Sequence, residues 1–125
     1  MPKVSKETGS AQEQGPSRFW TGTLDGYKVD LVECNEDTDL TPLLQGLPND
    51  QCPSPHWGYV LKGSMWWDVG QGREVYEAGD AYYVPPGHTS GASEGSEFLV
   101  FSPSDVMADV EAHMMRRAQE LHGAS

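Results

Sequence analysis

The chain has 125 residues, enough for one folded domain, and it is strongly acidic. Nineteen acidic against eight basic residues give a net charge of −11, which repels nucleic acid and anionic lipid surfaces, so neither is expected as a partner. The sequence has no apolar run long enough to span a membrane, and its first residues lack the apolar region of a secretion signal. It therefore predicts a soluble, cytoplasmic protein without a membrane partner.

Two different predictions follow for the N-terminal third. Residues 1–17 are rich in Ser, Gln, Glu, Gly and Pro, and ordering them costs backbone entropy with little burial in return, so a disordered tail is predicted. Residues 19–23 and 27–34 alternate polar and apolar side chains around Asp25-Gly26, which predicts a hairpin with a tight turn. Next, Thr41-Pro42-Leu43-Leu44 predicts a short helix that ends near Gly46.

Short strand-forming segments separated by glycine- and proline-rich turns follow. They cover residues 57–62, 65–69, 73–76, 81–84, 88–90 and 98–101. This spacing predicts an all-β barrel or double sheet over residues 18–103. A helix is predicted from about residue 105 to 121, capped by Ser104 and stopped by Gly123. One face of it carries Val106, Val110, His113, Met114 and Leu121, so residues 104–125 are expected to pack on the barrel or on a second subunit.

Potential metal donors lie beside two of the predicted strands. Asp50, Cys52 and His56 precede the first, and His88 follows a turn about thirty residues later. The only other cysteine is Cys34, so the chain has too few cysteines for a disulfide scaffold, and a reducing compartment would keep both as thiols. We expect Cys34 to be a core residue at the end of a strand.

The two donor-bearing segments resemble the two sequence motifs of the cupin superfamily, over roughly residues 48–102. When the first motif is aligned on Gly63, its glutamate position falls on His56, its second histidine on Cys52 and its first on Asp50. In the second motif Gly79, Pro85 and Gly87 match, whereas the family's histidine position falls on Ser90 and the imidazole here is His88. The resemblance implies a double-stranded β-helix (jelly-roll) barrel with a metal inside.

Cys52, His56 and His88 are the predicted metal ligands. Thiolate and imidazole are ligands for zinc, iron and copper, so one divalent transition metal of this kind is the expected cofactor. Three protein donors leave a fourth position for water or substrate, as in catalytic sites. The alternatives are that Cys52 is an inert packed thiol and that His56 is a hydrogen-bonded structural histidine. Asp50 fits a turn better than a ligand position.

The parity of the strands predicts what faces the barrel interior. Starting from His56, Gly58 and Val60 turn inward, and Gly58 would leave room for a ligand beside the metal. Tyr82 would share this cavity and is the predicted acid/base or positioning group. The row Trp57, Tyr59 and Leu61 would face the other way, toward the C-terminal helix or a second subunit. The resemblance to cupins favours a homodimer.

These observations predict a small metalloenzyme, of oxygenase, isomerase or lyase type, acting on a small organic molecule in the barrel. The alternative is a non-catalytic module that binds or senses a small ligand, because a fold by itself does not give function. A third hypothesis is a structural protein whose barrel is filled by its own side chains. Gly58 and the cluster of donors argue against that third hypothesis.

Overall fold

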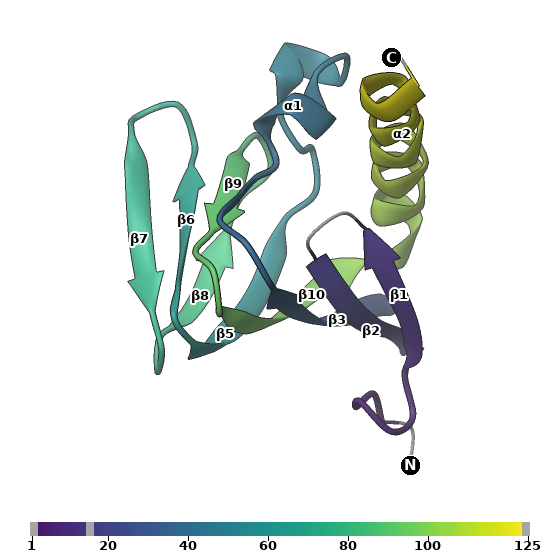
Figure 1. Ribbon diagram of the computed structural model, residues 1–125, viewed down its shortest axis with the longest axis vertical. Coiled ribbons are helices and arrows are strands. Elements are labelled where there is room, and N and C mark those ends of the chain that lie inside the picture. The colour runs from purple at the N-terminus through teal and green to yellow at the C-terminus, as the bar shows by residue number, and fades with distance from the viewer. Residues whose placement is uncertain (1–2, 15–16, 124–125) are drawn as a thin grey trace.

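The computed structural model describes residues 3–14 and 17–123 and contains two antiparallel sheets that face each other (Figure 1). The strands are β1 (Ser10–Gln14), β2 (Ser17–Leu24), β3 (Tyr27–Cys34), β4 (Thr38–Asp39), β5 (His56–Lys62), β6 (Ser64–Asp68), β7 (Arg73–Glu77), β8 (Ala81–Val84), β9 (Thr89–Ala92) and β10 (Glu97–Pro103). The helices are α1 (Thr41–Leu44), a single 3-10 turn η1 (Pro48–Asp50), and α2 (Ser104–Gly123). The predicted all-β jelly-roll barrel with a C-terminal helix is confirmed.

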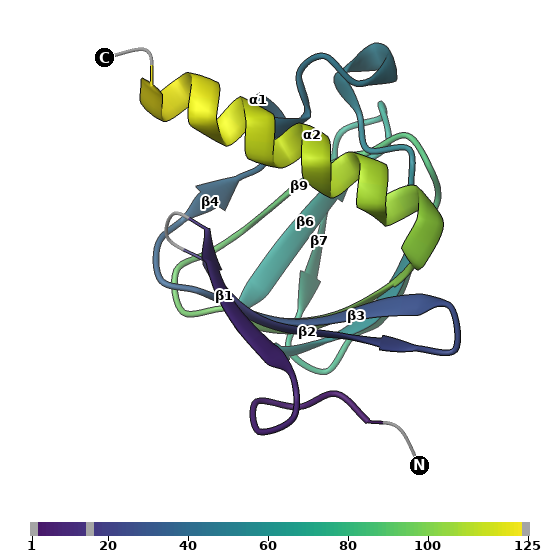
Figure 2. The ribbon, with the colours of Figure 1, turned by 90° about the vertical axis from the view of Figure 1, so that its right-hand side faces the viewer.

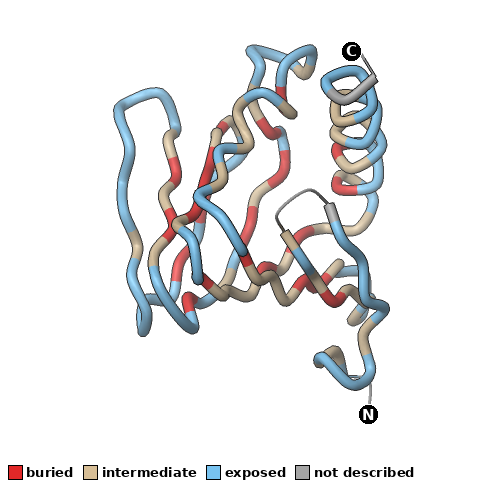
Figure 3. Tube along the Cα trace, viewed as in Figure 1, coloured by how far each residue is buried: buried red, intermediate tan, exposed pale blue. Residues whose placement is uncertain are grey.

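One sheet has six strands in the order β1-β2-β3-β10-β5-β8, and the other has four in the order β4-β9-β6-β7. Buried residues lie where the sheets face each other (Figure 3), around a core of Cys34, Val60, Met65, Trp67, Tyr82, Val84 and Ala92. Since inward and outward side chains alternate along a strand, β5 buries His56 and Val60 and exposes Trp57, Tyr59 and Leu61. The predicted parity of this strand is confirmed, as is the core position of Cys34.

The predicted hairpin is β2 and β3. Its turn places Asp25 at φ 47° and Gly26 at φ 82°, the left-handed conformations that a two-residue hairpin turn requires and that an Asp-Gly pair supplies. The turn sets the register in which Leu24 pairs with Tyr27 and Ser17 with Cys34. This register turns alternate residues of β3 toward the barrel interior.

The disordered tail predicted for residues 1–17 is wrong where Ser10–Gln14 form β1 and pair with β2, and residues 1–2 and 15–16 lie outside the described residues. Edge pairing satisfies backbone groups and needs no apolar side chains, which are what the composition of this segment lacks. In addition, the Lys6 ammonium lies 2.8 Å from a Glu33 carboxylate oxygen and 2.9 Å from one of Glu97. Main-chain pairing and these ion pairs therefore order the N-terminal segment, which has few apolar side chains to bury.

α2 crosses one end of the barrel, beside α1 (Figure 2). Met107 and Val110 of α2 join Leu44 and Cys52 in a second buried cluster. The predicted packing face of this helix is therefore wrong at its C-terminal end, since Leu121 is 50% exposed. The prediction also omitted Met107, which is buried. The predicted cap is also wrong, because the buried Ser104 hydroxyl has no hydrogen-bond partner among the described residues.

Polar contacts hold α2 in place. His113 Nε2 donates to the Gln45 carbonyl at 2.7 Å, and the Arg117 guanidinium donates to the Pro42 carbonyl and to the Gln45 side chain. α2 covers the barrel mouth, and Trp57, Tyr59 and Leu61 stay exposed on the outer sheet face. The homodimer expected from the resemblance to cupins stays a prediction. Within residues 3–14 and 17–123, no helix is both long and apolar enough to cross a bilayer.

Candidate metal centre

A backbone bridge brings the two donor-bearing segments together. Cys52, between η1 and β5, donates its N–H to the His88 carbonyl at 2.8 Å, and its own carbonyl accepts the Gly87 N–H at 2.8 Å. His56 begins β5 and pairs with Val84 at the end of β8. Because β8 leads through the Pro85–Gly87 turn to His88, this pairing and the bridge place all three side chains at one end of the barrel.

The side chains of Cys52, His56 and His88 converge. One ligand atom from each lies within 4.8 Å of the other two, and Cys52 Sγ is 3.5 Å from His56 Nε2. All three residues are at least 95% buried. Bonds from zinc to sulfur and nitrogen measure about 2.0 to 2.3 Å, so small adjustments of the side chains would bring the three atoms onto one ion.

Hydrogen bonds orient both imidazoles. His88 Nδ1 lies 2.9 Å from the Pro85 carbonyl, which can only accept, so this nitrogen carries the proton and Nε2 keeps a lone pair. His56 Nδ1 lies 2.7 Å from the Ser102 hydroxyl, which leaves its Nε2 facing Cys52. Metal-binding histidines in proteins are held through their second nitrogen in this way.

Burial keeps these groups neutral. Burial, together with smaller contributions from the neighbouring His88 and Lys28, lowers the pKa of His56 from 6.5 to about 3. Burial also lowers the pKa of His88 and raises the pKa of the Cys52 thiol. Neutral imidazole is the form that binds metals, whereas the thiol would release its proton to an ion. The donor set thus fits a transition metal in type, spacing and charge.

The neutral imidazoles predict that the metal-free protein loses stability in acid. Below pH 6.5 the unfolded chain protonates its histidines, whereas folded His56 stays neutral down to about pH 3. The free energy of unfolding should therefore fall by about 1.4 kcal/mol per pH unit across this window, and His88 should add to the fall. Urea unfolding across the window measures it. A His56→Gln variant, which keeps a partner for Ser102, should show a shallower slope, and an equal slope would contradict the prediction.

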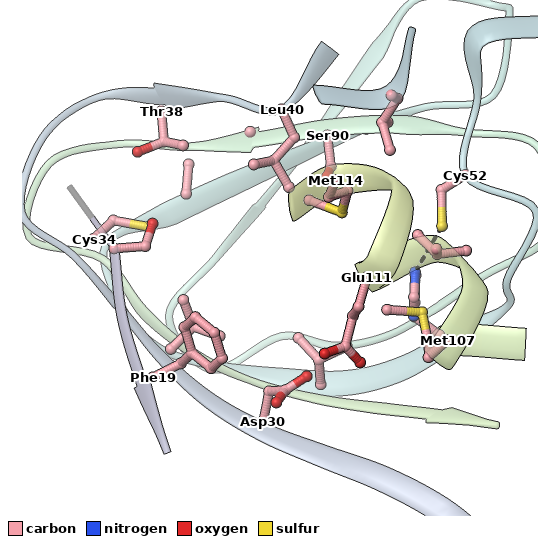
Figure 4. A pocket seen from close by; sticks show the side chains of 18 of the residues that line it. Phe19, Asp30, Cys34, Thr38, Leu40, Cys52, Ser90, Met107, Glu111 and Met114 are labelled. Atoms are coloured by element: carbon pink, nitrogen blue, oxygen red, sulfur yellow. Dashed lines mark hydrogen bonds between the residues drawn. The ribbon is translucent and has the colours of Figure 1, made fainter. Parts of the chain in front are cut away.

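The three donors lie in the wall of a cavity of about 400 Å³ between the sheets and α2. Most of the other wall residues are apolar and include Phe19, Val32, Leu40, Met65, Phe98 and Met114. Figure 4 shows Cys52 at one side of this space, with Met107 near it and Phe19 across the cavity. A ligand in this cavity would therefore meet the donor group at one end and hydrocarbon along most of its length.

Two positions differ from the sequence interpretation. The space above Gly58 is occupied by Tyr82, its cross-strand partner, because a Cβ at Gly58 would overlap the tyrosine ring and the Leu99 carbonyl. The prediction that Gly58 leaves room for a ligand is therefore wrong. The Tyr82 hydroxyl donates to that carbonyl at 2.9 Å, burial raises its pKa far above the ordinary value, and Tyr82 is not among the described residues that line the cavity.

Asp50 and Ser90 were the other positions that could have joined the donor group. Asp50 is exposed and accepts the Gly46 N–H at 2.9 Å, which confirms the turn interpretation over the ligand interpretation. Ser90, where the family pattern has histidine, lies in the cavity wall but outside the donor group. His88 stands in that group instead.

Sequence reasoning missed two features of this cavity. Lys28 and Asp30 lie in its wall on β3, and two charged residues on the inward face of a predicted strand were the signal that could have found them. Trp67 packs against both imidazoles, with its ring centroid 5.5 Å from that of His56 and 4.9 Å from that of His88. No sequence signal separated Trp67 from the other aromatic residues.

Comparison with known proteins shows which solved structures share this architecture. No protein-family model and no curated protein match the chain. Among solved structures, an RmlC-like cupin from Shewanella frigidimarina is similar, with 19% identity, a TM-score of 0.55, and coverage of 79% of this chain and 87% of its own.

Two enzymes have similar structures. The polyketide cyclase RemF from Streptomyces resistomycificus shows 21% identity and a TM-score of 0.59, with 82% of this chain and 79% of RemF covered. The nucleoside dehydratase Pac13 from Streptomyces shows 16% identity and a TM-score of 0.59, with 82% of each chain covered. Identities this low establish the architecture alone. The chain has the fold of a small cupin, with a C-terminal helix across one end of the barrel.

Proposed function

We propose that this protein is a metal-dependent enzyme that acts on a small, largely apolar organic molecule inside the barrel. The observation that carries the proposal is the convergence of Cys52, His56 and His88, within 4.8 Å of one another, in the wall of a cavity of about 400 Å³. Structural zinc sites use four protein donors, whereas three protein donors leave a position for substrate. The site is therefore of the catalytic kind.

The ion proposed is zinc, iron or copper. A thiolate and two imidazoles are soft or borderline donors, which favour these metals over calcium, magnesium or manganese. When bound, such an ion supplies Lewis acidity, which polarises a carbonyl or activates water, and iron or copper can also react with dioxygen.

The residues around the donors have supporting roles in this proposal. Pro85 and Ser102 fix the two imidazoles through their Nδ1 atoms. Trp67 packs against both rings and, together with the apolar walls, excludes water from the donor group. Exclusion of water strengthens every electrostatic interaction between the site and a bound substrate. The wall of this cavity would then select substrates by shape and apolar surface.

The fold itself is compatible with this proposal, since RemF is described as a polyketide cyclase and Pac13 as a nucleoside dehydratase. The alternative remains a non-catalytic module that binds a small ligand. One observation favours it: the Tyr82 hydroxyl, predicted as the acid/base group, is bound to a backbone carbonyl. The proposal therefore assigns no proton transfer to Tyr82.

Elemental analysis tests the proposal directly. Purified protein reconstituted with zinc, iron or copper and then desalted should retain one ion per chain. Cys52→Ser and His88→Ala variants should retain at least about tenfold less, since each loses one of three donors. Cys34→Ser is the matched control, because Cys34 is the other buried free thiol and lies outside the donor group.

Two results would contradict the metal centre. One is a folded wild-type protein that retains no ion under any of these conditions, which would favour the binding module. The other is full metal content in the His88→Ala variant, which would place the ion elsewhere. Circular dichroism of each variant separates loss of the ion from loss of the fold.

A further inference from the structure

A charged cluster interrupts the apolar wall of the cavity. The Lys28 ammonium lies 2.8 Å from both carboxylate oxygens of Asp30 and 2.9 Å from one oxygen of Glu111. Lys28 and Asp30 come from the inward face of β3, and Glu111 comes from α2. Figure 4 shows the Asp30 and Glu111 carboxylates side by side at the cavity wall, away from Cys52.

The carboxylates of this cluster can accept further hydrogen bonds. The Lys28 ammonium donates to both oxygens of Asp30 and makes an ion pair with one oxygen of Glu111. Each carboxylate oxygen can accept more than one hydrogen bond, and the second oxygen of Glu111 is not part of this ion pair. The cluster therefore has acceptor capacity left, and two carboxylates against one ammonium give it a formal net charge of −1.

Fastening α2 to the barrel does not account for the whole cluster. One ion pair between Lys28 and Glu111 would do that, yet Asp30 adds a carboxylate that is 92% buried, and burying a charge is costly. A second polar group of this region is also unsatisfied. The buried indole N–H of Trp67, beside the two imidazoles, has no acceptor among the described residues.

We propose that the Lys28–Asp30–Glu111 cluster is the polar anchor for a ligand that carries a hydroxyl or protonated amine. That group donates to Asp30 or Glu111, while an aromatic or alicyclic body packs against Phe19 and the methionines of the wall. This inference rests on the proposed function, because the far end of the ligand would face the Cys52, His56 and His88 group.

The anchor also excludes a class of ligand. A carboxylate or phosphate placed beside Asp30 and Glu111 would meet two like charges, and the one ammonium nearby already pairs with both of them, so its binding costs free energy inside a cavity of low dielectric constant. The chain's net charge of −11 opposes anions at longer range as well. The ligand class is therefore neutral or cationic, mostly apolar and hydroxylated or aminated, and small enough for about 400 Å³.

Equilibrium dialysis of the metal-free protein with matched two-ring probes tests the anchor. The probes are 2-naphthol, naphthalene and 2-naphthoate, which share one body and differ in the polar group. We expect 2-naphthol to bind about tenfold tighter than naphthalene, as a hydrogen bond to a carboxylate is worth about 1.5 kcal/mol or more. We expect 2-naphthoate to bind more weakly than 2-naphthol by a larger factor.

Variants assign the preference to the cluster. Glu111→Gln and Asp30→Asn should each reduce the preference for 2-naphthol over naphthalene, and two variants on different elements guard against a fold defect in one. Glu120→Gln is the matched control on α2, since Glu120 is outside the cavity wall and pairs with Arg117. Its binding should equal that of the wild type.

Three results would overturn the inference: equal affinity for 2-naphthol and naphthalene, unchanged preference in both carboxylate variants, or no binding of any probe. The His88→Ala variant separates this test from that of the metal centre. It should keep the preference for 2-naphthol even where it retains no ion, so either proposal can fail while the other stands.

Discussion

Replacing Gly58 by alanine is expected to destabilise the barrel by at least about 3 kcal/mol, at the upper end of overpacking changes. The new methyl group would overlap the Leu99 carbonyl on β10 and the Tyr82 ring on β8, the strands that flank β5. A flexible side chain could move aside, but a backbone carbonyl held in a sheet cannot move without breaking the pairing of Tyr59 with Leu99. Urea unfolding followed by circular dichroism measures the change.

Leu61→Ala on the same strand is the control for this experiment. Leu61 is 49% exposed on the outer face, so its truncation should change stability by less than about 1 kcal/mol. Gly58→Ala with wild-type stability would mean that β5 and β8 are not in the register that pairs Gly58 with Tyr82. The same variant therefore tests the pairing of β5 with β8, in which Tyr82 fills the space above Gly58.

Replacing Lys28 by methionine is expected to cost about 3 kcal/mol of stability. Methionine has nearly the length of lysine, so the apolar part of the side chain is kept while the ammonium, 5.7 Å from the Phe19 ring centroid, is lost. Asp30 and Glu111 would then share a partly buried site with no cation between them, and an uncompensated buried charge is costly. Side-chain exposures of 16% for Lys28 and 12% for Asp30 leave little water to screen the repulsion.

A second substitution shows whether charge is the cause. Adding Asp30→Asn to Lys28→Met removes the buried carboxylate and should recover at least half of the lost stability. Lys62→Met is the control, because Lys62 pairs with Glu97 at 3.4 Å but is 70% exposed, and surface ion pairs contribute less than about 1 kcal/mol. Equal losses in the Lys28 and Lys62 variants would show that the cavity cluster is as well solvated as the surface.

Local patterns were sufficient to predict much of the fold. The Asp25-Gly26 pair determines the β2–β3 turn, and alternation along β5 correctly separates buried Val60 from exposed Tyr59. Glycine and proline spacing gave the later strands to within a few residues. The cupin resemblance placed Cys52, His56 and His88 near one another, and the structure brings their ligand atoms together. That they bind an ion stays a prediction.

The remaining features depend on long-range pairing that the sequence does not display. Parity turns Gly58 inward, but only the register of β5 with β8 shows that Tyr82 fills the space above it. Lys28 and Asp30 are visible as charges on an inward face, yet Glu111 reaches them only because α2 folds back over β3. The strand β1 forms through main-chain pairing, which cannot be predicted from the side-chain composition of the segment.

The bridge between Cys52 and His88 has a thermodynamic consequence for the whole chain. It closes a loop that contains β5, β6, β7 and β8, and the two residues at its ends each carry a proposed ligand. An ion joining them would act as a removable cross-link, comparable to a disulfide, because it would restrict the unfolded ensemble of that loop. Chelation would then remove this restriction from a loop that contains four of the ten strands, and the free energy of unfolding would fall although no packed side chain had been replaced.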